Sequence, residues 1–497
     1  MRRKNLDWPE QPRIYEINTW PWLQALSNIY KHEITLNNIP PEVFSQELKF
    51  FDFIWLMGVW ERSPQSREIA LNHTGLQQEY HKALSDFKTE DVVGSPYSIF
   101  DYHVDPHLGG EDSLKNFRKQ LTERNIQLLL DYVPNHVAID HHWTLEKSNI
   151  FIEGTIKDMN IYPNEFFTVG NKVLAHGRDP YFTPWTDTVQ INAFSSEARK
   201  KAVNILINIA EQCDGVRCDM AMLMTNDVFS RTWGERAGIQ PEKDFWREVI
   251  SEVLEKFPDF LFIAEVYWNM EWELQQQGFH FCYDKRLYDR MLYNSAEAIR
   301  DHLHAEWDYQ RKLLRFIENH DESRAITAFG EERSQAAAIV SLPLPGAKLV
   351  HEGQMKGYKV KIPVQLGRRP VEDDNQDLLN FYQKLLSIVS AEGLTKGKWA
   401  LCKIEPINTE NYTYTNLISY QWRSREQHHL IVVNYSPNPA QGHVRIEELN
   451  YDTYNWSFTD LLTQKRFIYK GKDLDTNGLY IDLSAWSGHI FYIKQID

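Results

Sequence analysis

The sequence predicts an α/β protein: a barrel of eight parallel strands, a small domain inserted after the third strand, and a C-terminal antiparallel β-sandwich. Short, nearly all apolar segments recur along the first 390 residues, as expected for strands that are covered on both faces. Most of them are separated by segments with helical periodicity, which favours parallel βα units. Eight such units close into a (β/α)8 barrel.

The eight predicted strands share an apolar character and a length of five to eight residues. Their ranges are 13–18, 52–57, 126–133, 215–219, 261–265, 279–283, 314–318 and 347–351. Helices are predicted over 40–50, 112–124, 195–212, 242–257 and 377–390. Polar residues gather where the third, fourth, fifth and seventh strands end, which is the rim where barrel enzymes carry their active sites.

The periodicity divides the chain into three predicted domains. The barrel is expected over residues 1–137 and 191–393. Between 138 and 190 the pattern lapses over a stretch too long for an ordinary loop, which indicates an inserted domain. Residues 394–497 carry short alternating segments divided by turns, which predict a β-sandwich. This sandwich could be a carbohydrate-binding module or a domain that only packs.

Composition excludes several classes of partner. The net charge of −15 over 497 residues disfavours nucleic acid and anionic membranes. No run of 18 apolar residues and no signal peptide are recognised. The four cysteines show no metal-ligand spacing, so we expect reduced thiols in a cytoplasmic protein. Nothing in the sequence indicates an oligomeric state.

The fourth predicted strand carries Arg217 and Asp219 two residues apart. Alternation along a strand places both side chains on one face, about 6–7 Å apart. An arginine next to an aspartate keeps the carboxylate ionised at neutral pH. An ionised carboxylate at a strand end is a candidate nucleophile, although a purely structural ion pair would show the same sequence pattern.

Three more strand ends carry comparable groups: Asp131 with Asn135-His136, then Glu265, then His320-Asp321. Cleavage of an acetal needs an acid to protonate the leaving oxygen and a carboxylate to meet positive charge at the anomeric carbon. Several carboxylates on one rim, with histidines and an arginine, therefore suit glycoside chemistry on a carbohydrate substrate.

Four segments resemble, in order, the signature motifs of the α-amylase family of retaining glycoside hydrolases and transglycosidases. They are Asp131-Tyr-Val-Pro-Asn-His136, Gly215-Val-Arg-Cys-Asp219, Ala264-Glu-Val266 and Phe316-Ile-Glu-Asn-His-Asp321. Each ends a predicted strand, and with the inserted and C-terminal domains the resemblance covers nearly the whole chain.

The resemblance implies a role for each site residue. Asp219 would be the nucleophile, Glu265 the general acid/base, and Asp321 a stabiliser of the transition state. Arg217 would orient Asp219, with Asp131 supporting that arginine. Three further residues would contact the sugar at the cleaved bond, by hydrogen bonding or, for the tyrosine, by stacking: His136, His320 and Tyr97.

The chain departs from the family pattern after Asp219. Many α-amylases carry Lys-His at the third and fourth positions, for product binding and a calcium ligand, where this chain has Met222-Leu223. Asn135, another typical calcium-ligand position, is present. We therefore predict no metal ligand and no cofactor, with calcium possible but doubtful. Ser98 also replaces an aspartate that is common after the stacking tyrosine.

The sequence thus predicts a retaining glycosidase that cleaves α-glucosidic bonds of oligo- or disaccharides. Two alternatives remain. A transglycosidase would use the same carboxylates but let a sugar hydroxyl replace water. A non-catalytic, amylase-like glycan-binding or regulatory protein could lose its carboxylates, whereas this chain keeps Asp219, Glu265 and Asp321.

Overall fold

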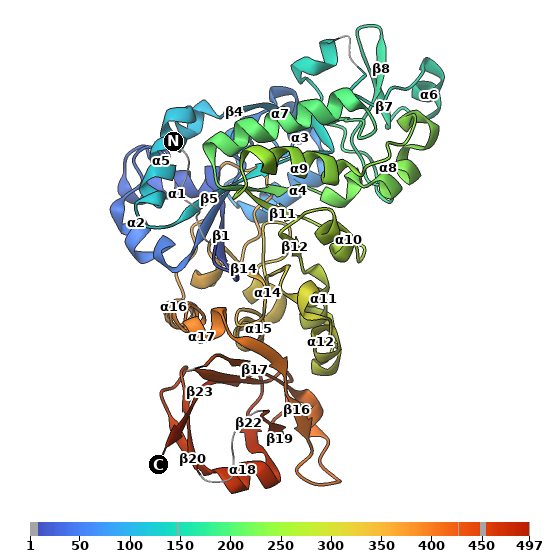
Figure 1. Ribbon diagram of the computed structural model, residues 1–497. Coiled ribbons are helices and arrows are strands. Elements are labelled where there is room, and N and C mark those ends of the chain that lie inside the picture. The colour runs from blue at the N-terminus through green and yellow to red at the C-terminus, as the bar shows by residue number, and fades with distance from the viewer. Residues whose placement is uncertain (1–7, 147–148, 426, 448–453, 497) are drawn as a thin grey trace. The chain divides into compact units, whose positions relative to one another are not determined.

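A computed structural model describes residues 8–146, 149–425, 427–447 and 454–496 (Figure 1). Eight parallel strands close into a barrel in the order β1-β14-β13-β12-β11-β10-β5-β2. Their bounds are β1 Arg13–Asn18, β2 Phe53–Met57, β5 Gln127–Tyr132, β10 Gly215–Cys218, β11 Leu261–Ala264, β12 Phe281–Tyr283, β13 Leu313–Arg315 and β14 Ala347–His351. The predicted barrel and all eight predicted strand positions are confirmed.

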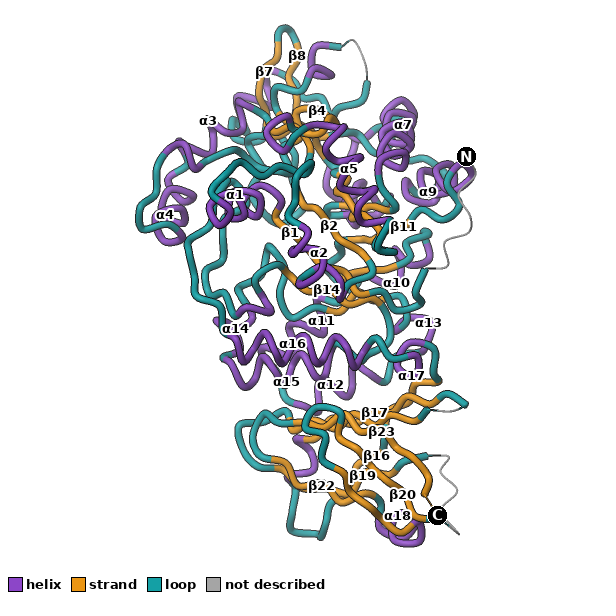
Figure 2. The backbone as a smooth tube through the Cα atoms, turned by 90° about the vertical axis from the view of Figure 1, so that its left-hand side faces the viewer, coloured by secondary structure: helices purple, strands orange, loops and turns teal. Residues whose placement is uncertain are grey.

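Helices connect the barrel strands, and Figure 2 distinguishes them from the strands by colour. The helices that match the predicted ranges are α2 Pro41–Gln46, α5 Gly110–Thr122, α7 Ser196–Gln212, α9 Phe245–Lys256 and α16 Gln376–Val389. Helix α7 begins at Ser195, whose hydroxyl accepts the N–H of Ala198. This cap satisfies a backbone donor that the first turn of a helix otherwise leaves unpaired.

The register of β10 places its arginine next to a carboxylate. β10 pairs in parallel with β5 and with β11, and Arg217 lies opposite Asp131 on one side and Ile263 on the other. All four residues of β10 are buried. A charged side chain on such a strand must find partners of opposite charge, because an isolated buried charge is strongly unfavourable.

The seventh strand is shorter than the sequence predicts. It ends at Arg315, whereas the apolar pattern extended it to Glu318. After the strand the chain turns, and side chains accept the backbone N–H groups of the turn: the Glu318 carboxylate accepts the N–H of Ala325 at 2.7 Å, and Asn319 Oδ1 accepts the N–H groups of Asp321 and Glu322. Such local bonds compete with a β-ladder.

The long stretch after β2, for which the sequence predicts no strand, contains a pair of antiparallel strands with helices between them. Strands β3 (Trp60–Arg62) and β4 (Ile99–Val104) pair antiparallel, and the helices are α3 (Pro64–Asn72) and α4 (Thr74–Ala83). No strict alternation or long helical period marks β3, which has three residues and a shifted register. Short irregular strands of this kind give little periodic signal.

Residues 138–190 fold around their own small core. Strand β6 (His136–Ala138) pairs with β9 (Thr188–Gln190), and β7 (Phe166–Val169) forms a hairpin with β8 (Lys172–Ala175). The core residues are apolar and buried: Val137, Ile150, Phe151, Leu174, Val189, Ile191 and, from helix α7, Ala198. A small core built mainly from one stretch of chain is typical of an inserted domain, although the boundaries 138 and 190 stay predictions.

The C-terminal part forms two antiparallel sheets around another apolar core. The larger has the order β15-β17-β18-β23-β20-β21, and the smaller has the order β16-β19-β22. Their bounds are β15 Lys398–Leu401, β16 Lys403–Glu405, β17 Leu417–Arg423, β18 His428–Asn434, β19 Ala440–Arg445, β20 Asn455–Asp460, β21 Arg466–Lys470, β22 Leu479–Leu483 and β23 Gly488–Ile496. Strand β22 alternates buried and exposed residues, as a half-buried strand should.

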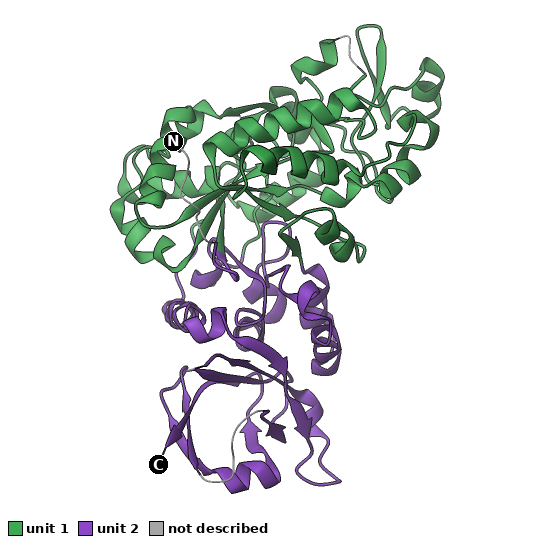
Figure 3. Cartoon of the chain, viewed as in Figure 1, with its two compact units in different colours: residues 1–7, 14–283, 360–371 green, residues 8–13, 284–359, 372–497 purple. Residues whose placement is uncertain are grey.

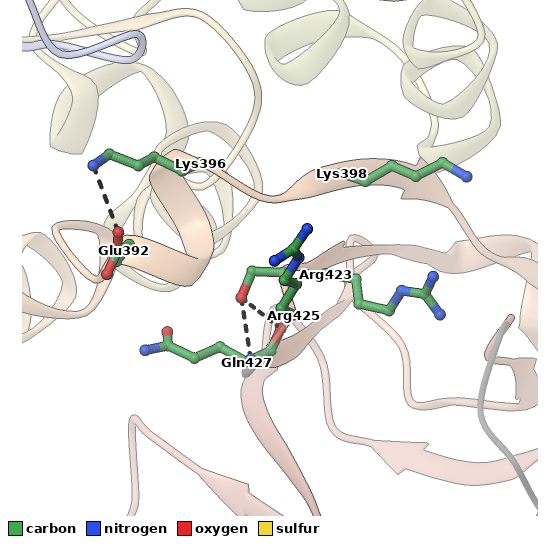
Figure 4. A pocket seen from close by; sticks show the side chains of 7 residues that line it. Glu392, Lys396, Lys398, Arg423, Arg425 and Gln427 are labelled. Carbon is green, nitrogen blue, oxygen red and sulfur yellow. Dashed lines mark hydrogen bonds and ion pairs between the residues drawn. The ribbon is translucent and has the colours of Figure 1, made fainter.

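The chain divides into two compact units (Figure 3). Unit 1 is mainly residues 14–283 and 360–371, and unit 2 is mainly residues 284–359 and 372–497. In unit 2 a hollow of about 860 Å³ is lined by several basic side chains (Figure 4). One of them is Lys396, whose Nζ lies 3.5 Å from Oε1 of Glu392. No residue predicted for chemistry lines this hollow. Among the described helices, none is long and apolar enough to cross a lipid bilayer.

Candidate active site

Arg217 is the centre of a buried cluster of charges in unit 1. The guanidinium contacts two carboxylates at once, with Nη1 2.8 Å from Oδ1 of Asp219 and Nη2 2.8 Å from Oε2 of Glu265. Oδ1 of Asp131 lies farther away, at 3.7 Å from Nη1. The structure therefore brings Arg217 together with three carboxylates that the sequence predicts for the site. Arg217 is 1% exposed.

The cluster keeps Arg217 charged. Burial disfavours the cation, but Glu265, Tyr97, Tyr283 and Asp219 act against burial and raise the pKa of its guanidinium above the ordinary value. One permanent positive charge thus faces three carboxylates. An excess of negative charge in a buried place suits a reaction in which positive charge develops on the substrate.

Glu265, directly after β11, is held at both of its oxygens. Oε2 accepts the backbone N–H of Met220 at 2.6 Å, and Oε1 accepts the hydroxyl of Tyr267 at 2.8 Å. Met220 lies in the left-handed region with φ 41° and ψ 46°, which is unusual for a residue with a side chain. The turn after β10 is therefore shaped so that a backbone donor meets the carboxylate, and uncommon backbone of this kind gathers at functional sites.

Asp131 is hydrogen-bonded by residues in and between β2 and β3. Its carboxylate accepts the indole N–H of Trp55 at 3.2 Å and the N–H of Gly58 at 2.9 Å, and its backbone carbonyl accepts the indole N–H of Trp60. These bonds fix Asp131 beside Arg217, and its supporting role stays a prediction.

Tyr97 and His136 belong to the same cluster. The ring centroid of Tyr97 is 5.2 Å from the guanidinium carbon of Arg217. His136 hydrogen-bonds to the backbone of Tyr97, and burial lowers the pKa of this histidine to about 4 despite that bond. His136 is therefore neutral at physiological pH and acts as a hydrogen-bonding group. Trp185 packs against it at 5.1 Å between ring centroids.

His320 and Asp321 lie in unit 2, shortly after β13. Nε2 of His320 is 3.0 Å from Oδ2 of Asp321, and the Asp321 side chain is 43% exposed while the His320 side chain is 2% exposed. Asn319 Oδ1 accepts the N–H of Asp321 at 3.0 Å and fixes its backbone. Within their unit, these two predicted residues form an ordered pair that presents a carboxylate to solvent.

Sequence reasoning missed three contributors to the cluster. They are Met220, Tyr267 and Tyr283, and the hydroxyl of Tyr283 lies 3.3 Å from Nε of Arg217. Tyr267 follows Glu265 by two residues, and Tyr283 is the last residue of β12, so position at a strand end was an available signal for both. The contact of Met220 depends on its unusual backbone, which no sequence pattern showed.

The described residues near Asn135 do not fit a calcium site. Its amide oxygen accepts a hydrogen bond from Nε2 of Gln190 at 2.9 Å, so it already has a donor. Met222 and Leu223, which stand where the family pattern has polar residues, are buried and offer no side-chain oxygen. Calcium needs six to eight oxygen ligands, several of them carboxylates. No group of three or more potential metal-ligating side chains occurs among the residues described.

Comparisons with known proteins agree with this arrangement. A family model described as "Alpha amylase, catalytic domain" matches residues 51–385. Alpha-amylase 3 of Dictyoglomus thermophilum is 23% identical over 424 residues, which cover 75% of this chain and 78% of that protein. An intracellular maltogenic amylase of Bacillus subtilis is 23% identical over 414 residues, which cover 78% of this chain and 64% of that protein.

Solved structures share the fold over almost the whole chain. The crystal structure of a noncanonic maltogenic alpha-amylase from Thermotoga neapolitana is 18% identical, has a TM-score of 0.66, and covers 98% of this chain and 99% of that one. At this identity the similarity establishes the fold alone. The family match is decisive, because it spans more than half of the sequence. The chain belongs to the alpha-amylase family of glycosidases.

Proposed function

We propose that the protein is a retaining glycoside hydrolase that cleaves α-glucosidic bonds of oligo- or disaccharides by double displacement. The observation that carries this proposal is the single guanidinium of Arg217 between Asp219 and Glu265, at 2.8 Å from each. Retention needs two carboxyl groups about 5–5.5 Å apart on either side of the scissile bond. Two carboxylates that share one cation are close neighbours, as this mechanism requires.

In the first step Glu265, protonated, gives its proton to the glycosidic oxygen while the carboxylate of Asp219 attacks the anomeric carbon. The bond to the leaving sugar breaks and a glycosyl ester on Asp219 forms. In the second step Glu265, now ionised, takes a proton from water, whose oxygen attacks the same carbon and releases Asp219. Asp321 would stabilise both transition states through sugar hydroxyls.

The remaining site residues would bind and orient the sugar. Tyr97 would stack on the ring, and His136 and His320 would hydrogen-bond its hydroxyls. Arg217 would orient Asp219, whose Oδ1 it contacts. A cytoplasmic location is supported by the absence of disulfides among the four cysteines and by the name of the Bacillus subtilis relative, an intracellular maltogenic amylase.

Proton NMR of the anomeric signals tests this proposal. Purified protein is mixed with a panel of α-linked glucosides, and release of the α-anomer first is the expected result. New glycosidic linkages in place of free sugar would favour the transglycosidase. Initial release of the β-anomer, or no turnover of any substrate, would contradict the proposal, and the latter would favour a glycan-binding role.

A further inference from the structure

Arg62, the last residue of β3, is a buried arginine that forms no ion pair with any carboxylate in the described part of the chain. Among the described residues its only hydrogen bonds run from Nη1 to two backbone carbonyls, those of Gly94 at 2.8 Å and Val364 at 3.3 Å. Nε and Nη2 are buried and have no hydrogen-bond partner. Arg62 as a whole is 8% exposed. Orphaned donors of this kind are rare and call for an explanation.

Burial lowers the pKa of Arg62 to about 10, with Asp105, Tyr97 and Asp131 acting weakly in the opposite direction. The group is still a cation at neutral pH. A buried cation without a paired anion is unfavourable, and an apolar side chain would pack in its place without that penalty. The position therefore needs what an arginine supplies, which is a long side chain with donors at its end.

The surroundings of Arg62 are shaped to admit the guanidinium. Its carbon lies 5.2 Å from the ring centroid of Trp20, a cation–π distance. Gly58 has φ +74°, and a Cβ at that position would come within 3.1 Å of Nη2 and 2.7 Å of the Cβ of Pro96. A side chain at residue 58 would thus displace either the guanidinium or the loop that contains Pro96.

The two carbonyls that Arg62 binds belong to segments far apart in sequence. Gly94 begins the loop 94–97 that ends in Tyr97, and Val364 belongs to the segment 360–371, which lies in the same compact unit. The two segments also bond directly, from the N–H of Val93 to the carbonyl of Gln365 at 2.8 Å and from the N–H of Gly367 to that of Asp91 at 2.7 Å. Arg62 closes this contact at the end nearer Tyr97.

We propose that Arg62 is a positioning residue that holds the loop 94–97 against the segment 360–371 and thereby fixes the ring of Tyr97 for sugar binding. It acts through Tyr97 and does not touch the substrate. The inference rests on the proposed function, in which Tyr97 stacks on the sugar. Loss of the bond to Gly94 removes one of the contacts that hold the loop, so the ring must be ordered further when substrate binds, which weakens binding more than it slows the chemistry.

Steady-state kinetics of Arg62→Met and Arg62→Lys, with the best α-glucoside from the NMR panel, test the proposal. Arg62→Met is expected to raise KM about tenfold and to change kcat less than threefold. Arg62→Lys keeps a donor at the end of the side chain and should recover part of that loss. Arg67→Met is the matched control, because Nε of Arg67 also donates to a carbonyl of the same stretch, that of Val92, from a more exposed position.

Tyr97→Ala, alone and combined with Arg62→Met, separates the outcomes. If Arg62 acts through Tyr97, Arg62→Met adds nothing to KM once Tyr97 is removed. A raised KM in Tyr97→Ala with an unchanged KM in Arg62→Met overturns the positioning role and leaves the proposed function intact. An unchanged KM in Tyr97→Ala contradicts the stacking role of Tyr97 and the positioning role of Arg62, whereas only absent turnover or release of the β-anomer by the wild type contradicts the proposed hydrolase. A lower Tm with wild-type KM identifies Arg62 as merely structural. If Arg62→Met does not fold, Arg62→Gln takes its place, because the shorter side chain does not reach both carbonyls, and wild-type KM in that variant overturns the proposal.

Discussion

Two buried arginines on barrel strands have opposite surroundings. Arg217 on β10 faces three carboxylates. Two of them, Glu265 and Asp219, together with Tyr97 and Tyr283, raise its pKa above the ordinary value despite burial. Arg315 on β13 ion-pairs with one carboxylate, that of Asp284, and burial lowers its pKa to about 9. Asp284 is bonded in turn by Nε2 of His302 at 2.9 Å. Both arginines are essentially inaccessible to solvent.

The difference lies in the balance of charge. Around Arg315 a single carboxylate, that of Asp284, meets the guanidinium, and a second cation, Lys348, lies opposite Arg315 on β14, so negative charge is not in excess. The other guanidinium bonds go to the side chain of Gln310 and to backbone carbonyls. Around Arg217 negative charge is in excess. A balanced pair holds a fold in place, whereas an excess of carboxylate is unfavourable for stability and useful for chemistry. The comparison predicts that changes near Arg217 affect activity and that changes near Arg315 affect stability.

The largest expected effect is that of Asp219→Asn, set against Asp284→Asn. An amide cannot attack the anomeric carbon, so kcat/KM of Asp219→Asn should fall by about 10⁴-fold or more while the thermal midpoint changes little. Asp284→Asn should unfold at lower temperature but keep wild-type kcat/KM in the folded fraction. Substantial activity in Asp219→Asn would sink the assignment of the nucleophile.

The two arginines themselves give the next effect. Arg315→Met leaves the carboxylate of Asp284 buried without its guanidinium, and removing one partner of a buried pair costs about 3–5 kcal/mol in free energy of unfolding. Arg217→Met removes the group that orients Asp219, and kcat/KM should fall about 100-fold. Urea unfolding and initial rates measure the two quantities. Equal loss of activity in both variants would contradict the comparison.

The sequence predicts some of this arrangement because it depends on local periodicity. The neighbouring positions of Arg217 and Asp219 follow from alternation along one strand, and the apolar run of β2 marks a strand covered on both faces. The bond from Arg62 to Val364 joins residues 302 positions apart, and no local pattern carries such information. No local sequence pattern predicts the cluster around Arg315 either. The catalytic roles and the domain boundaries stay predictions.

Histidines extend the comparison to the two units and give the smallest effect. Burial lowers the pKa of His136 in unit 1 and of His428 in unit 2, each to about 4. The unfolded chain binds a proton at about 6.5. Between pH 6.5 and 4 the unfolded state therefore binds more protons than the folded state, so stability falls as the pH falls through this window. At pH 5 each histidine should cost about 2 kcal/mol.

Urea unfolding of His428→Gln at pH 7 and pH 5 isolates one of these titrations. The imidazole Nε2 of His428 lies 2.9 Å from Oε1 of Gln421, and glutamine can still donate to that oxygen without titrating. The variant should lose about 2 kcal/mol less stability than the wild type between the two pH values. An equal loss would show that His428 does not stay neutral in the folded state. His136→Gln should relieve the same stability loss but also raise KM, because only His136 belongs to the cluster around Arg217.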